Sequence, residues 1–314
     1  KILFTSHNWP RWGNEDLLEF LTLQRDVYRW MHDQTMRLAN KGYTGVEIAN
    51  TLKLPDEFLA NDHTRGYYGD LIHNSKAVYQ RYLSWYDGNP ANLNKLPPTE
   101  VGKRYVQLAG GADALLKSAQ KSFDEGDYRW VAEVLNHLVF AQPDNDAALQ
   151  MLAYAYRQLG YQAESGPWRD IYLSGALELQ SESREQFYDP GLARAFVQQV
   201  PLMQFMKALS VRLDAEKAEA ELLVINVLFT DQQQNFVLTV RNSVLHYQQL
   251  PAANNADASI ALTKNLFVDL LLGQVGIQQL LTTDELQVDG SVLKLLKFFS
   301  LLGESNDNFN IVTP

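Results

Sequence analysis

The residues most capable of acid–base or metal chemistry in this 314-residue chain are six scattered histidines. No two of them have the His-x-His or His-Glu-x-x-His spacing of a zinc site. Two close carboxylate–histidine neighbours are Asp62 with His63 and Asp70 with His73. We interpret both pairs as polar residues at helix ends, because a metal site would need further ligands brought together by the fold. Cysteine is absent, which excludes disulfides, thiolate-bound metals and a cysteine nucleophile.

Other catalytic and binding patterns are absent from the sequence as well. There is no Gly-x-Ser-x-Gly elbow, no phosphate-binding loop and no dinucleotide-binding glycine pattern. Aromatic residues at 67–68 and 79–86 recur at helical spacing, which favours a hydrophobic core or a subunit interface over a stacking platform. The net charge of −10 argues against a nucleic-acid partner. No apolar run in the sequence reaches the length of a membrane span.

His7 differs from the other histidines by its setting. Residues 1–6 predict a short buried strand, and His7 follows in a loop that contains Trp9, Pro10 and Trp12. Ends of strands are where scaffolds often place ligand-binding residues, although a single histidine can equally be structural. A lone strand cannot satisfy its own backbone groups, so we expect its partner strands upstream of Lys1 or in another chain. The start without methionine is typical of the middle of a longer protein.

Helices dominate the sequence from Glu15 to about residue 179. A long helix is predicted from Glu15, followed by a short helix at 43–49 in which Thr44 and Glu47 form a capping box. The next helix is predicted over 71–86 and stops at the breaker cluster 87–90. Residues 95–100 are predicted as a loop. Residues 112–179 are predicted as helical hairpins packed in the style of tetratricopeptide repeats, with Gly110-Gly111 as the turn before them.

The last third of the chain has a mixed pattern. The polar segment 181–192 predicts a linker. It is followed by a predicted helix at 201–213, strands at 221–229 and 258–262, one long or bent strand over 235–247, and helices at 266–272 and 292–302. Strands followed by helices predict an α+β domain. The final helix is apolar almost all round, which is typical of a core helix or of one that lines an apolar cavity.

Three runs of unusual composition together resemble the alkyl sulfatases of the metallo-β-lactamase superfamily, which desulfate detergents such as dodecyl sulfate. The runs are 6–13, 65–74 and 85–90, and the likeness extends along the whole chain. The resemblance implies a multidomain protein in which 1–14 is the last strand of a metallo-β-lactamase αββα domain. It implies an all-α, tetratricopeptide-like dimerisation domain over 15–180, a linker over 181–192 and an α+β sterol-carrier-protein-like domain over 193–314.

The same resemblance implies that the parent protein is a sulfuric ester hydrolase with two zinc ions per subunit. His7 matches a zinc-ligand position, but the family's His-x-His-x-Asp-His cluster does not occur in this chain. Most zinc ligands are therefore expected upstream, and the chain alone is expected to be inactive. The expected partners are a second copy in a homodimer, the metallo-β-lactamase portion and a long-chain alkyl sulfate. Members of the family are often exported, so the resemblance implies a periplasmic or secreted protein.

The sterol-carrier-like domain is expected to bind the alkyl chain in an apolar groove. The competing interpretation is that the same side chains form an ordinary core. For the whole chain, the alternative function is a stand-alone lipid-binding or protein-interaction module without catalysis. The residues expected to line the groove are Met203, Met206, Phe267, Leu270, Leu271, Leu295, Leu296, Phe298 and Phe299.

Overall fold

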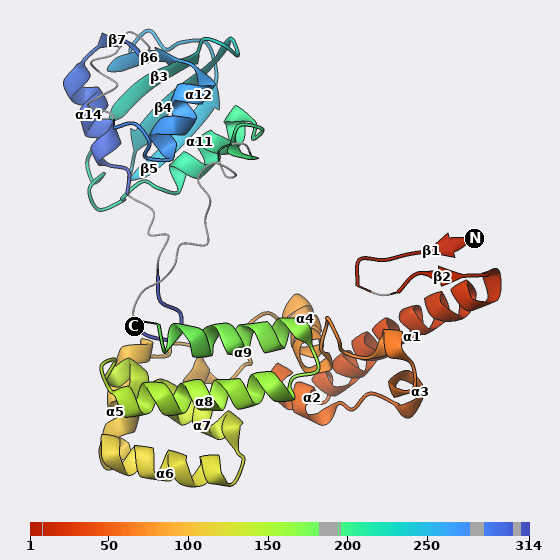
Figure 1. The fold of residues 1–314 in the computed structure, drawn as a ribbon. Coiled ribbons are helices and arrows are strands. Elements are labelled where there is room, and N and C mark those ends of the chain that lie inside the picture. The colour runs from red at the N-terminus through yellow and green to blue at the C-terminus, as the bar shows by residue number, and fades with distance from the viewer. Residues whose placement is uncertain (8, 182–193, 195, 277–285, 304–308) are drawn as a thin grey trace. The chain divides into compact units, whose positions relative to one another are not determined.

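A computed structural model describes residues 1–314 except 8, 182–193, 195, 277–285 and 304–308. The chain divides into two compact units (Figure 1). The first contains Lys1–Arg184 together with Asn310–Pro314, and the second contains Glu185–Phe309. The predicted linker at 181–192 falls almost wholly outside the described residues. No helix in the described ranges is long and apolar enough to cross a bilayer.

The first unit begins with a short antiparallel ribbon. Strand β1 (Ile2–Leu3) pairs with β2 (Arg11–Trp12), with Leu3 opposite Arg11. Two expectations are therefore wrong. The partner of the first strand comes from this chain, because the loop after it folds back, and the strand is not buried, since Ile2 and Phe4 are 62% and 77% exposed. A two-residue ribbon is only marginally stable by itself, so the helix that follows must hold it in place.

Helix α1 (Asn14–Ala39) carries one buried stripe at helical spacing, which includes Phe20, Val27 and Met31. It packs against α4 (Leu71–Leu83) and against the 3-10 turn η1 (Asp62–Thr64). Helices α2 (Gly45–Thr51) and α3 (Asp56–Leu59) lie between them in sequence. The predicted capping box is confirmed, because Thr44 N donates to Glu47 Oε2 at 2.8 Å and Glu47 N donates to Thr44 Oγ1 at 3.4 Å.

Two predicted boundaries in this region are wrong for local backbone reasons. Helix α4 ends at Leu83 instead of residue 86, because Ser84 adopts a positive φ of 74° that a helix cannot accommodate. The predicted loop at 95–100 contains the start of helix α5 (Pro98–Leu108). Proline suits the first helical position, since its missing N–H has no intrahelical partner there. The 3-10 turn η2 (Pro90–Asn92) lies between α4 and α5 in sequence.

The rest of the first unit confirms the predicted helical region. Helices α6 (Ala112–Asp124), α7 (Tyr128–Ala141), α8 (Asp146–Gln162) and α9 (Gly166–Glu178) pack in sequence order, and α5 also packs on α7. Their shared core is fully buried at Val131, Leu135, Leu138 and Leu152. Gly110 and Gly111 have positive φ at the turn before α6, as that turn requires.

The second unit confirms the predicted α+β fold class. Among the residues that the structure describes, its sheet has five strands in the order β5-β4-β3-β6-β7, and only the β3–β6 pair of these is parallel. The sheet is packed against helices through a common core that includes Phe229, Phe236 and Phe267. The strands are β3 (Leu223–Phe229), β4 (Gln234–Arg241), β5 (Val244–Gln249), β6 (Ala258–Leu262) and β7 (Gln287–Gly290), and the described helices are α11 (Leu202–Ser210), α12 (Lys264–Leu271) and α14 (Val292–Ser300).

One strand prediction in this unit is wrong. Residues 235–247 do not form one long or bent strand, because β4 and β5 are two strands of a hairpin. The turn between them consists of Asn242 and Ser243, whose φ values are 54° and 57°. Two successive residues with positive φ make the tight turn whose twist suits a β-hairpin, and asparagine at the first position tolerates it well.

Candidate functional site

The loop of the ribbon, η1 and the segment after it border an open cavity of about 600 Å³ in the first unit. It brings together residues more than 50 positions apart in sequence. The cavity is lined by Ser6, His7, Trp9, Asp62 and Tyr67. The histidine that the sequence singled out, the carboxylate of an Asp-His pair and a member of an aromatic run therefore share one site.

Tyr68 orients His7 within this site. The two rings stack with their centroids 3.6 Å apart and an interplanar angle of 14°. Stacking uses the face of the imidazole, whereas both nitrogens lie on its edge. The contact fixes the plane of the ring without using the atoms that bind a proton or a metal ion.

The start of α9 holds the aromatic segment in place. Ser165 Oγ donates to the carbonyl of Tyr68 at 3.0 Å, and Gly166 N donates to the carbonyl of Tyr67 at 2.8 Å. Arg65 forms an ion pair with Glu164, and its guanidinium lies 5.5 Å from the centroid of the Tyr67 ring. The site is thus built from the ribbon on one side and anchored to the helical core on the other.

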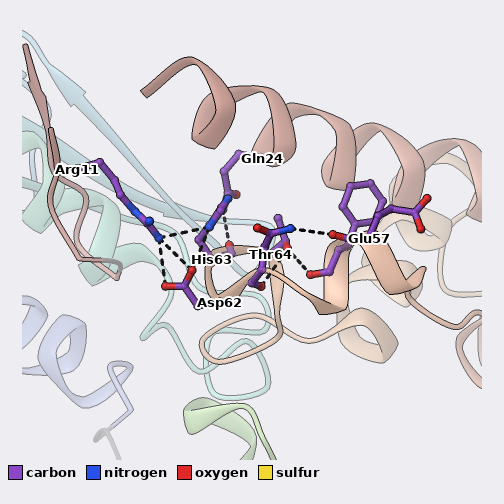
Figure 2. A network of polar contacts seen from close by, with 8 residues as sticks. Arg11, Gln24, Glu57, Asp62, His63 and Thr64 are labelled. Atoms are coloured by element: carbon purple, nitrogen blue, oxygen red, sulfur yellow. Dashed lines mark hydrogen bonds and ion pairs between the residues drawn. The ribbon is translucent and has the colours of Figure 1, made fainter. Parts of the chain in front are cut away.

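An arginine that sequence reasoning missed anchors Asp62. Nη2 of Arg11 donates to both carboxylate oxygens of Asp62, at 3.0 and 3.1 Å (Figure 2). Burial acts to raise the pKa of Asp62, but hydrogen bonds from His63 and Arg11 outweigh it and hold that pKa below its usual value. The Arg11 guanidinium also lies 5.5 Å from the centroid of Phe20 in α1. Asp62 is thereby kept as an ionised carboxylate at the cavity wall.

His63 lies behind Asp62, away from solvent. Its side chain is only 6% exposed, with Nδ1 3.2 Å from Asp62 Oδ1 and 3.4 Å from Arg11 Nη2. The ring lies 4.6 Å from that of Phe20, and Nε2 is buried without a hydrogen-bond partner among the described residues. Gln24 of α1 donates to the backbone carbonyl of His63, which ties η1 to the long helix (Figure 2). Asp62 and His63 are therefore more than polar residues at a helix end.

Asp70 and His73 do have the structural role that the sequence predicted. Asp70 caps α4 by accepting from the backbone N–H groups of Ile72 and His73, at 2.7 and 3.1 Å. Nδ1 of His73 accepts from Trp168 Nε1 at 3.4 Å. These two residues form a helix cap and an aromatic contact, and they do not line the cavity.

The described residues do not by themselves make a zinc site. They contain no group of three or more His, Asp or Glu side chains placed to hold a metal ion. Zinc takes about four ligands in proteins, and the cavity offers one imidazole, His7, together with a carboxylate already engaged by Arg11. The orientation of the His7 ring is compatible with its predicted role as one ligand, and that role stays a prediction.

The residues predicted to bind an alkyl chain fall into two groups in the second unit. Met206, Phe267, Leu295 and Phe298 are at most 3% exposed and belong to its hydrophobic core. The others retain accessible surface, as Met203 does with 39% of its area exposed. This partly exposed group consists of Met203, Leu270, Leu271, Leu296 and Phe299.

The aromatic runs are not part of the core. Tyr82 and Trp85 are 57% and 67% exposed within the described chain, and Tyr67 and Tyr68 are 48% and 58% exposed. The core interpretation is therefore wrong for these four residues. A subunit interface, the other interpretation, is compatible with large aromatic side chains on the surface.

Comparisons with known proteins match the whole chain. Residues 44–182 match the family described as alkyl sulfatase dimerisation, and residues 191–314 match the alkyl sulfatase C-terminal family. The sequence is 44% identical to a linear primary-alkylsulfatase of Pseudomonas sp. and 42% identical to the alkyl/aryl-sulfatase BDS1 of Saccharomyces cerevisiae. These alignments cover 100% of this chain but only 47% and 48% of the two relatives. The chain thus spans about half the length of the curated relatives it matches.

A solved alkylsulfatase structure gives the same result. The stereoselective inverting sec-alkylsulfatase Pisa1 from Pseudomonas sp. matches with a TM-score of 0.88 and 40% identity, over 100% of this chain and 49% of that chain. Apo sterol carrier protein 2 from Yarrowia lipolytica matches 37% of this chain at 20% identity and a TM-score of 0.22. From the two family matches and the identities above 40% along its full length, the chain belongs to the alkyl sulfatase family, of which it contains the dimerisation and C-terminal domains.

Proposed function

We propose that this chain is the dimerising and C-terminal part of a zinc-dependent sulfuric ester hydrolase that converts long-chain primary alkyl sulfates to alcohol and sulfate. The observation that carries the proposal is the match to alkylsulfatases along the full chain. The cavity that combines His7 with an anchored carboxylate supports it. Because the chain spans about half the length of those relatives, the activity is proposed for the longer protein of which it is a part.

His7 is the residue that we propose as a zinc ligand, with the remaining ligands supplied from outside the described residues. When bound, zinc would hold sulfate oxygens and lower the pKa of a coordinated water toward neutrality. This chain contributes residues that orient the His7 ligand. Tyr68 fixes the imidazole plane, and hydrogen bonds from Ser165 and Gly166 fix the segment that carries Tyr68. A ligand that is held in this way loses little conformational freedom when it binds a metal.

Asp62 is proposed to orient a cation or a water molecule at the cavity wall. Its lowered pKa keeps it negatively charged at neutral pH, with both oxygens held by Arg11. A fixed negative charge would repel a sulfate group in direct contact. Asp62 is therefore suited to contacts with donors such as a bound water or a metal ion's coordination sphere, and Arg11 positions it.

The alkyl chain is proposed to bind the second unit. Burial of a methylene contributes about 0.8 kcal/mol, so burying half of a twelve-carbon chain would stabilise the complex by about 5 kcal/mol. Phe298 and Phe299 are matched neighbours for a test, because Phe298 is 1% exposed in the core and Phe299 is only partly buried. We expect Phe299→Asp to weaken dodecyl sulfate binding below the micellar concentration, measured by calorimetry, with an unchanged circular dichroism spectrum. Phe298→Asp should unfold the unit. Unchanged affinity in Phe299→Asp would refute this groove position.

Catalysis is tested in two steps. This chain with added zinc is expected to release no sulfate from dodecyl sulfate, and robust turnover would contradict the proposed dependence on further residues. In the protein encoded by the complete reading frame, His7→Ala should lower both sulfate release and the zinc content measured by mass spectrometry. The control is His73→Ala, whose side chain contacts Trp168 and does not line the cavity. Equal zinc content and turnover in His7→Ala and the control would reject the assignment.

The proposed partner is a second copy of the chain. The match to a dimerisation domain and the exposed aromatic residues Tyr82 and Trp85 support this assignment. Light scattering after size exclusion should give twice the chain mass of 35.7 kDa. A monomer across the accessible concentration range would contradict it. We further propose, from the family resemblance, that the protein is periplasmic or secreted, which cell fractionation tests.

A further inference from the structure

The closing segment Asn310–Pro314 lies on the helical unit, although the whole α+β unit separates it from those helices in sequence. The backbone N–H groups of Ile311 and Val312 donate to Oε1 of Glu178, at 2.8 and 3.1 Å. Glu178 is the last residue of α9. Hydrogen bonds to an ionised carboxylate are roughly twice as strong as neutral ones, so these two contacts are a specific attachment point.

Val312 is the apolar anchor of the segment. It packs against the hydrophobic core of the helical unit, whereas Ile311 is 71% exposed. Val312 lies next to Gly175, three residues before Glu178 on α9. A Cβ added there would lie 3.4 Å from Cγ1 of Val312 and 3.4 Å from Cδ2 of Tyr156 on α8. A glycine and an aromatic ring thus form a niche next to an anionic acceptor.

The charge and shape of this surface determine which kind of ligand it can bind. Glu178 accepts free backbone N–H groups and would repel a phosphate, a sulfate or another carboxylate. The niche at Gly175 accepts a small branched side chain. Within the segment, Nδ2 of Asn310 donates to the carbonyl of Pro314 at 3.3 Å, which closes the segment on itself and lowers the entropy lost on docking. The surface therefore fits a short peptide turn with an apolar anchor.

We propose that α8 and α9 form a peptide-binding site, and that the Asn310–Pro314 segment of the same chain occupies it as a tether. The α+β unit, Glu185–Phe309, is inserted between the two parts of the helical unit and is thereby attached at both of its ends. A second attachment raises the effective concentration of one unit near the other and limits the volume that the inserted unit can explore. This tether is independent of the proposed catalytic function.

Disulfide cross-linking tests the site directly, because the chain has no cysteine of its own. Gly175→Cys combined with Val312→Cys places two thiols at the contact described above, where a Cβ at 175 lies 3.4 Å from Cγ1 of Val312, the position that a cysteine sulfur at 312 can take. The control combines Val312→Cys with Leu177→Cys on the same helix, at a residue that is 59% exposed. We expect mild oxidation to remove the free thiols of the first pair within a single chain and to leave those of the control. Equal thiol loss in both pairs, or a covalent dimer, would overturn docking within the chain.

A binding experiment separates the site from its tether. The chain ending at Phe309 should bind a fluorescent Asn-Ile-Val-Thr-Pro peptide saturably in anisotropy measurements. A peptide with Asp in place of Val should bind at least tenfold more weakly, because it would put a carboxylate beside Glu178 and lose the apolar contact. The protein is unchanged between these two titrations, so a folding defect cannot produce the difference. Equal binding of both peptides, or no binding of the first, would overturn the proposal.

Discussion

Gly102 in α5 provides the sharpest test of the packing of the helical unit. A Cβ at this position would lie 2.4 Å from the carbonyl oxygen of His137 and 3.2 Å from the backbone N of Ala141, both in α7. These are backbone atoms in the middle and at the end of a helix, so they cannot rotate away. Gly102→Ala gains about 1 kcal/mol in helix propensity, but overpacking of this kind costs about 1–3 kcal/mol or more. We therefore expect a net loss of up to about 2 kcal/mol in the free energy of unfolding.

Tryptophan fluorescence isolates this effect, because all six tryptophans lie between residues 9 and 168 and thus in the helical unit. Urea unfolding followed at this signal should shift to a lower midpoint in Gly102→Ala. The matched control is Gly166→Ala, at the start of α9, where an added Cβ meets only the carbonyl oxygen of Tyr67 at 3.6 Å. This control should be neutral or slightly stabilising. A midpoint for Gly102→Ala at or above that of the control would refute the close α5–α7 contact.

Three further predictions follow from single contacts. Arg11→Met should raise the pKa of Asp62 toward its ordinary value, because the guanidinium that stabilises the carboxylate is lost; a carboxyl-carbon NMR titration that does not move would contradict this. Burial lowers the pKa of His137 in the folded unit. The contribution of neutral His137 to the free energy of unfolding should therefore be fully present above about pH 6.5 and decline as the pH falls toward the folded pKa. His137→Gln should flatten that decline in urea titrations read by tryptophan fluorescence. Ser243→Gly should stabilise the β4–β5 hairpin by about 1 kcal/mol, because glycine adopts the observed φ of 57° without steric cost, whereas Ser243→Val should destabilise it; thermal unfolding by circular dichroism ranks the three chains.

The sequence predicted most of the helices because their apolar residues recur at a clear spacing and their ends carry local signals. The capping box at Thr44 is such a signal, and it is present in the structure. The predictions failed where one or two residues decide the backbone. Asn242 and Ser243 turn one apparent strand into a hairpin, and Pro98 starts a helix where a loop was expected. Strand β7 (Gln287–Gly290) was missed because its residues other than Val288 are polar or small and it lies at the sheet edge.

The candidate site was only half predictable. His7 and the Asp62–His63 pair could be found by residue type, but the sequence does not show that they meet. Arg11 is 51 residues from Asp62, and an arginine in a loop carries no signal of its ion pair. Placing these residues together depends on how α1 packs against η1, which is a tertiary contact.

The contact of Val312 with the helical core has a consequence for the order of synthesis. A ribosome translates the α+β unit before it reaches this residue, so helices α8 and α9 emerge early while the niche at Gly175 is still open to water. The helical unit can reach its final packing only after Val312 has been translated. Until then, the emerging chain presents an unfilled apolar niche beside Glu178, and a chaperone or another nascent copy could reach it first.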